Sequence, residues 1–234
     1  ELEDQTREIS RIEFKVALNG KAILKEKIYE GQMSASIYPR PLRRQKSLTQ
    51  NIVYISPTRH ASGEVFLGEV LNRPDLYEEM LSILKEFDEN ILSINYDKNN
   101  FGRGTYKILS KSNNKALPLN VYGDGMKKAI LLMSAVVKAN DGILLLDEFE
   151  TAIHTSAMER TFKWILETCK KLNVQVFMTS HSIEAISKVL KCCPDMEKDI
   201  RMITLVETLN GIKARNVDAA KAIKLKEQYG LELR

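Results

Sequence analysis

Two apolar runs with polar ends stand out in the sequence: residues 140–150 read NDGILLLDEFE, and residues 174–182 read VQVFMTSHS. The run from Ile143 to Leu146 is too short and too unbroken for a surface helix, so it predicts a strand buried on both faces of a parallel sheet. The run from Val174 to Met178 predicts a second such strand, and residues 155–172 between them have helical periodicity. The unit is therefore strand-helix-strand.

Polar side chains follow each predicted strand. In open α/β sheets the ligand site lies at the carboxyl ends of the strands, where Asp147, Glu148 and His181 would emerge. Nucleoside triphosphatases use a strand ending in Asp-Glu to hold Mg²⁺ and to polarise a water. We expect Asp147 to bind the metal, Glu148 to activate the water, and His181 to contact the γ-phosphate or that water. The alternative for His181 is a histidine that caps the following helix.

A glycine-flanked turn precedes another predicted helix, residues 126–139. Gly123, Asp124 and Gly125 would leave backbone N–H groups free at the positive end of this helix, which is an anion site, and Lys127 and Lys128 add charge. A turn that only starts a helix is the other interpretation of the same residues.

The composition limits the class of protein. The 234 residues, of which 44% are hydrophobic and 28% charged, suit one sizeable α/β domain. No apolar run approaches the roughly 18 residues of a membrane span, and no secretory signal is visible, so we expect a cytoplasmic protein without a membrane partner. Three cysteines suit reduced thiols, and a net charge of +4 permits nucleic-acid contact without indicating it strongly. The first residue is Glu, from which we expect a processed chain or an excised fragment.

The remaining pattern predicts an α/β fold: a mostly parallel sheet flanked by helices, with antiparallel hairpins at the N-terminal and C-terminal ends. Alternating runs around Asn19-Gly20 and around Asn210-Gly211 predict these hairpins, and Tyr106–Leu109 with Leu117–Val121 predict another. Further helices are expected at 75–94, 182–190 and 217–229. We expect a single partial domain over 1–234, in which residues 1–50 form a hairpin and a basic loop and residues 51–234 carry the motifs.

The order of these motifs resembles the second half of an ABC-type ATPase head, as in the RecF, SMC and OLD-like AAA ATPases. Residues 122–128, YGDGMKK, resemble the signature segment; residues 143–148, ILLLDE, resemble Walker B; residues 179–182, TSHS, resemble the switch-histidine segment. Residues 150–155, ETAIHT, resemble the stretch that holds the D-loop, which adds His154 to the nucleotide-binding residues. The resemblance covers about residues 51–216. Asp124 stands where a serine contacts phosphate in relatives, and Thr155 where proline is frequent.

The resemblance implies ATP and Mg²⁺ as cofactors, and a homodimer in which two heads sandwich two ATP molecules. It also implies work on DNA or on an effector protein, as in DNA repair or antiphage defence.

A phosphate-binding loop, Gly-x-x-x-x-Gly-Lys-Ser/Thr, occurs nowhere in the sequence. Gly20-Lys21 is not one, because Lys15 and Ala22 occupy the places of the first glycine and the hydroxyl residue. In the family this loop comes earlier, so we expect it before Glu1 or on another chain, and this chain to be inactive alone. The main alternative is a non-catalytic interaction module with an ATPase-like fold. A metal-dependent nuclease using Asp147, Glu148 and Glu150 is a weaker one.

Overall fold

The computed structural model describes residues 11–18, 21–29, 51–98, 104–113, 115–208 and 211–229, and the chain divides into two compact units, Glu1–Leu48 and Thr49–Arg234. In the first unit, β1 (Arg11–Leu18) pairs antiparallel with β2 (Lys21–Tyr29), which confirms the N-terminal hairpin. The Asn19-Gly20 turn and the basic loop at 31–50 lie outside the described residues.

The second unit is built on a parallel sheet of three strands in the order β3-β7-β8. These are β3 (Ile52–Ile55), β7 (Ile143–Leu146) and β8 (Gln175–Met178). The register aligns the last residues of all three strands, so the segments after them leave the same edge of the sheet. The strand-helix-strand unit predicted from residues 140–182 is confirmed.

The two faces of this sheet differ. One face contributes Val53, Ile55, Leu144 and Leu146 to the hydrophobic core. On the opposite face Ile52, Tyr54 and Phe177 are about half exposed within the described part of the chain, although side chains on both faces of a parallel sheet are usually covered. The prediction that both faces of these strands are buried is therefore confirmed for the face that packs on the core and wrong for the opposite face.

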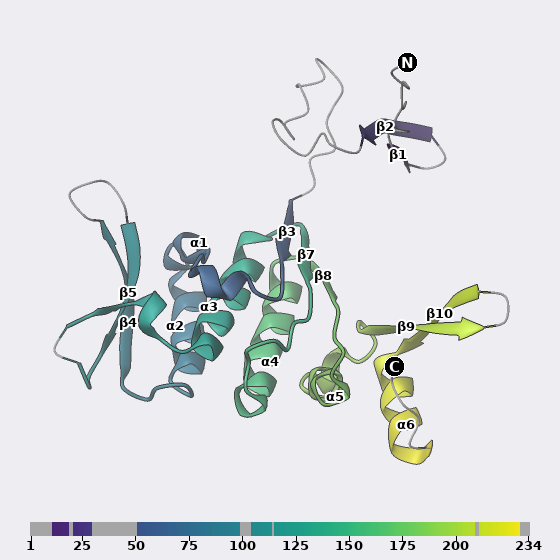
Figure 1. Ribbon diagram of the computed structural model, residues 1–234. Coiled ribbons are helices and arrows are strands. Elements are labelled where there is room, and N and C mark those ends of the chain that lie inside the picture. The colour runs from purple at the N-terminus through teal and green to yellow at the C-terminus, as the bar shows by residue number, and fades with distance from the viewer. Residues whose placement is uncertain are drawn as a thin grey trace, which may run out of the picture. The chain divides into compact units, whose positions relative to one another are not determined.

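Helices α3 (Asp124–Lys138) and α4 (Thr155–Lys171) cover the buried face (Figure 1). α3 begins two residues earlier than predicted, so Gly123 is its N-cap and Gly125 lies inside its first turn. α5 (Ile183–Lys191) follows β8, and the Ser182 hydroxyl caps it by accepting a hydrogen bond from the Ala185 N–H at 3.2 Å. A serine side chain in this place stabilises the first turn of a helix.

An antiparallel sheet lies on the other side of α1 (Leu67–Leu71) and α2 (Pro74–Leu84) (Figure 1). It consists of β4 (Ile91–Lys98), β5 (Gly104–Ser110) and β6 (Leu117–Pro118). The helix predicted at 75–94 is wrong beyond residue 84. The Asp88 carboxylate accepts from the Asn90 N–H in a turn, and the apolar residues Ile91 and Ile94 belong to a strand paired with β5. The predicted third hairpin is present but short, since β6 pairs with β5 through two residues only.

The C-terminal elements follow the prediction: β9 (Arg201–Thr208), β10 (Gly211–Asp218) and α6 (Ala219–Tyr229). β9 and β10 form an antiparallel ribbon, and α6 packs its alanines against α5. Among the residues described, no helix has the length and apolarity needed to cross a bilayer.

Candidate functional site

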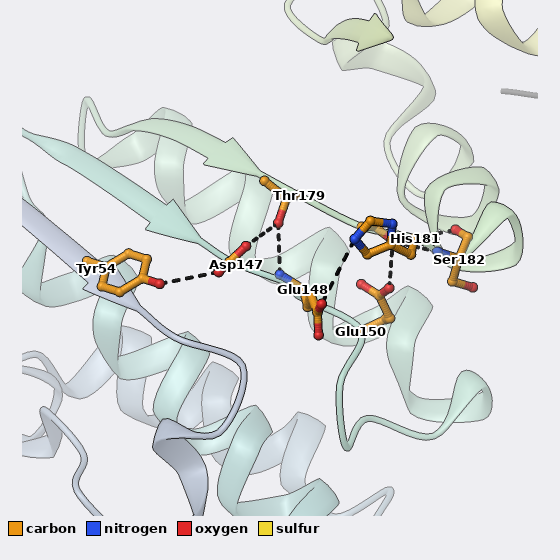
Figure 2. A network of polar contacts seen from close by, with 8 residues as sticks. Tyr54, Asp147, Glu148, Glu150, Thr179, His181 and Ser182 are labelled. Atoms are coloured by element: carbon orange, nitrogen blue, oxygen red, sulfur yellow. Dashed lines mark hydrogen bonds and ion pairs between the residues drawn. The ribbon is translucent and has the colours of Figure 1, made fainter. Parts of the chain in front are cut away.

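The candidate site lies at the carboxyl edge of the parallel sheet, where Asp147 directly follows β7 and Thr179 directly follows β8 (Figure 2). The Thr179 N–H donates to the Leu146 carbonyl at 2.9 Å, and the Phe149 N–H donates to the Thr179 carbonyl at 3.1 Å. The ladder between the two strands thus continues past their ends. It holds the segment after β7 beside the segment after β8.

Asp147 is fixed at both carboxylate oxygens. The Thr179 hydroxyl donates to Oδ1 at 2.6 Å, and the Tyr54 phenol donates to Oδ2 at 3.3 Å from β3. Partial desolvation, then the charge of Asp147 and the hydrogen bond to it, raises the pKa of Tyr54, so the phenol remains a donor. Residues from all three strands therefore meet at this carboxylate.

Glu148 has a left-handed backbone, with φ of 42°. Residues with long side chains adopt this conformation rarely, and it costs about 1–2 kcal/mol. The Glu148 N–H donates to the Thr179 hydroxyl at 2.9 Å, and its carbonyl accepts from the Thr151 N–H at 3.0 Å. These bonds hold the turn. Strained backbone of this kind is common where a side chain must be aimed at a ligand.

His181 and Glu150 complete the group. The Nε2 atom of His181 lies 4.0 Å from the nearest carboxylate oxygen of Glu148, and both side chains reach solvent, with relative exposures of 90% and 44%. The His181 backbone N–H donates to Glu150 Oε1 at 3.1 Å. Glu150 thereby fixes the segment that carries His181, and the alternative of His181 as a helix cap is wrong because Ser182 caps α5.

The glycine-flanked turn lies against the loop that follows β7. A Cβ atom on Gly125 would meet the Ala152 carbonyl oxygen at 3.1 Å, so the start of α3 and this loop are in close approach. A Cβ on Gly123 would meet nothing within 4 Å. Lys127 pairs with Asp124 at 2.7 Å, and this bond and charge lower the pKa of Asp124. An anion arriving at this helix end would have to compete with Asp124 for the lysine.

His154 has a structural role in this state. It is the N-cap of α4, where its Nδ1 accepts from the Ser156 N–H at 3.3 Å, and it lies 2.9 Å from the Ser156 hydroxyl. Within the described residues it makes no hydrogen bond to Asp147, Glu148 or His181. The structure brings those three residues together and leaves His154 out of their network.

Four residues of the site carry contacts that were not assigned from the sequence: Tyr54, Lys128, Glu150 and Thr179. Thr179 had a signal, since it is the first polar residue after an apolar run, directly opposite Asp147. Tyr54 had no such signal in the sequence, because its hydrogen bond to Asp147 requires β3 to pair with β7. The two residues are 93 positions apart. Lys128 is buried under the site, and the sequence marked it only as added charge.

Asp147 and Glu148 suit a magnesium ion better than a softer metal. Across the described chain, no group of three or more His, Cys, Asp or Glu side chains could hold a metal by itself. Magnesium commonly takes only one or two carboxylates from the protein and completes its shell with waters and substrate phosphates. The two oxygens of Asp147, each already oriented by a hydroxyl donor, fit that pattern.

The sequence is similar to one family model and to several known proteins. The family model described as "AAA domain, putative AbiEii toxin, Type IV TA system" matches residues 9–187. An ATP/GTP phosphatase of Helicobacter pylori is 33% identical over 131 residues, which cover 53% of this chain and 34% of that protein. An uncharacterized protein of Methanocaldococcus jannaschii is 28% identical over 112 residues, covering 48% of this chain and 98% of the other. The match thus spans about a third of the first relative and nearly all of the second.

Two solved structures are similar at lower identity. One, described under ATP-driven dimerization and DNA-stimulated activation of SMC ATPases, has a TM-score of 0.46 at 14% identity, covering 67% of this chain and 92% of that chain. The other, an Smc head bound to the C-winged helix domain of ScpA, has a TM-score of 0.45 at 13% identity, covering 64% and 44%. Since the family model matches well over half of the sequence, the chain belongs to the AAA domain family described as putative AbiEii toxin of a type IV TA system.

Proposed function

We propose that this chain is the part of an ATPase head that supplies the Mg²⁺ ligand and the catalytic groups for ATP hydrolysis. The observation that carries the proposal is the network in which Thr179 holds both the Asp147 carboxylate and the Glu148 backbone at one sheet edge. Asp147 would bind the metal, which neutralises phosphate charge when bound. Glu148 would take the proton of the attacking water, and His181 would contact the γ-phosphate.

A complete ATP site also needs a phosphate-binding loop and contacts from a second head. The phosphate-binding loop belongs to a part of the protein outside this sequence or to another chain. The exposed apolar face of the parallel sheet, with Ile52, Tyr54 and Phe177, supports such a neighbour, because parallel sheets are normally covered on both faces. The start of α3, with Gly123, Gly125 and Lys127, would face the nucleotide held by a second head in a homodimer.

The resulting cycle is ATP-dependent dimerisation coupled to hydrolysis, in DNA repair or antiphage defence, acting on DNA or on an effector protein. The relatives support nucleotide chemistry, since one of them is named an ATP/GTP phosphatase.

The test is Glu148→Gln in the protein that includes the phosphate-binding loop. We expect turnover to fall by roughly 10²–10⁴-fold while ATP binding is kept, because the amide cannot accept the proton but preserves the shape of the side chain. Turnover is measured by phosphate release, and binding by calorimetry. Near-normal hydrolysis by the variant would rule out Glu148 as the base.

A second candidate is a non-catalytic interaction module, and the lack of a phosphate-binding loop in this sequence favours it for the chain alone. Under either candidate this chain by itself binds Mg-ATP weakly or not at all, because the lysine and amide cradle for the phosphates is missing. Tight Mg-ATP binding to the isolated chain in calorimetry would contradict both.

A further inference from the structure

Lys128 is a buried cation beneath the candidate site. It lies in the second turn of α3 and is fully buried, with 0% of its surface exposed. Its Nζ donates to the Pro57 carbonyl at 3.1 Å, which is its one hydrogen bond to the described residues. Lysines are almost never buried to this degree without a partner for the charge. A single carbonyl oxygen leaves that requirement unmet.

The carboxylates of the candidate site supply the negative charge that balances Lys128, without a direct hydrogen bond to it. Burial lowers the pKa of Lys128, and the negative charges of Glu150, Glu148 and Asp147 oppose this effect, with Glu150 contributing most. The neighbouring Lys127 pairs with Asp124 at 2.7 Å. The start of α3 lies against the loop that follows β7, where a Cβ atom on Gly125 would meet the Ala152 carbonyl oxygen at 3.1 Å. Lys128 is therefore a buried cation on a helix that packs against the loop carrying Glu150.

Glu150 shows why this charge matters. One of its oxygens accepts from the His181 N–H, while the other, Oε2, is buried and has no hydrogen-bond partner among the described residues. A buried, unpaired carboxylate oxygen is costly unless a nearby cation balances it. The positive charge of Lys128 attracts the Glu150 carboxylate, and Glu150 in turn fixes the segment that carries His181.

We propose that Lys128 is a positioning residue of the ATPase site: from α3 it supplies the buried counter-charge that holds Glu150, and through Glu150 the His181 segment, in place. This role rests on the proposed function. Lys128 touches no nucleotide and donates no proton. It acts by keeping three like charges on a short loop in one arrangement, and its hydrogen bond to Pro57 fixes the loop after β3 against the same group.

The activity test is Lys128→Met in the complete protein, since methionine keeps much of the volume and removes the charge. We expect kcat for ATP hydrolysis to fall by about 10- to 100-fold, the effect of a small misplacement of catalytic groups, with KM changed less than about threefold. Lys128→Arg should recover part of the loss. The matched control is Lys138→Met on the same helix, whose lysine pairs with Glu69 at an exposed position and should leave both constants unchanged.

A double-mutant cycle separates this role from the proposed function. Lys128→Met, Glu150→Gln and the double variant are compared by urea unfolding without nucleotide, and we expect the double variant to be more stable than the sum of the single effects predicts. Should Lys128→Met not fold, the double variant should fold again. Additive effects, a double variant that stays unfolded while Glu150→Gln folds, or an unchanged kcat in Lys128→Met would overturn the proposal. If the cycle shows coupling between Lys128 and Glu150 but the complete wild-type protein hydrolyses no ATP, the proposed function alone is contradicted.

Discussion

Thr179 joins the two strands of the site through a single hydroxyl group. That hydroxyl donates to Asp147 at 2.6 Å and accepts from the Glu148 N–H at 2.9 Å, so one atom fixes both the metal-binding candidate and the base candidate. A hydrogen bond to a charged acceptor is stronger than one between neutral groups. The same atom thus holds the backbone of Glu148 where that backbone is left-handed.

Replacing Thr179 by valine removes the hydroxyl and keeps the shape. We expect ATP turnover of the complete protein to fall by about 10- to 100-fold, because the Asp147 carboxylate and the Glu148 backbone each lose a hydrogen bond. Stability should fall by no more than about 1 kcal/mol, since the residue is exposed. Thr179→Ser is the control and should keep most of the activity, as it retains the donor and acceptor. A valine variant that keeps its activity while the serine variant loses it would show that the methyl group, and not the hydroxyl, is what matters.

At the scale of elements, the parallel sheet depends on a close approach at its amino end. A Cβ atom on Gly142 would lie 2.1 Å from the Asn51 carbonyl oxygen, the atom that accepts from the Ile143 N–H at 2.8 Å. Only glycine lets β7 start at this distance from β3. The site at the opposite end depends on the same register, because Tyr54 reaches Asp147 only when the two strands are aligned as observed.

Gly142→Ala should therefore destabilise the protein by about 2 kcal/mol or more, since backbone atoms must move apart. Gly123→Ala is the matched comparison, because a Cβ there meets nothing within 4 Å, and its cost should stay below about 1 kcal/mol. Urea unfolding of the two variants measures the difference. A Gly142→Ala variant as stable as Gly123→Ala would show that the strands tolerate a wider spacing.

The elements of the site were predictable from the sequence where local pattern decides them. The apolar runs before Asp147 and Thr179, and the helix between them, follow from composition and periodicity alone. The helix predicted at 75–94 failed because Ile91 and Ile94 continue a helical apolar spacing by chance, while pairing with β5 gives them a strand. Tyr54 and Lys128 were beyond reach for a related reason: their roles arise from contacts with segments 93 and 71 positions away.

For the molecule as a whole, the buried cysteines make the folding stability depend on pH. All three thiols are buried, and burial raises the pKa of Cys169 to about 12 and raises the pKa of Cys192 and Cys193 as well. The folded protein therefore keeps these thiols neutral at a pH where the unfolded chain, with thiol pKa values near 8.5, has lost the protons. The contribution to stability is complete below that pH and is lost as the pH rises toward 12.

The buried Cys169 thiol should cost about 1.4 kcal/mol of stability per pH unit in that window. We expect the urea midpoint to fall between pH 8 and pH 10, and Cys169→Ala to fall less steeply over the same interval. The slope is the measurement, because the cavity left by the substitution changes stability at both pH values alike. Identical slopes in the variant and the parent would show that the thiol at 169 ionises freely in the folded protein.

The proposed ATP sandwich joins two copies of the molecule. The start of α3 is flanked by glycines and open at Gly123, and under the proposed function it faces the nucleotide of a second head, which makes the interface the same on both subunits. Glu148→Gln in the complete protein should hold ATP uncleaved, so its mass by light scattering should double with Mg-ATP and return to the monomer value when magnesium is chelated. Lys127→Glu in that background reverses the charge at the helix start and should prevent dimers while ATP still binds. If both proteins form dimers in equal amounts, the start of α3 does not belong to the dimer interface.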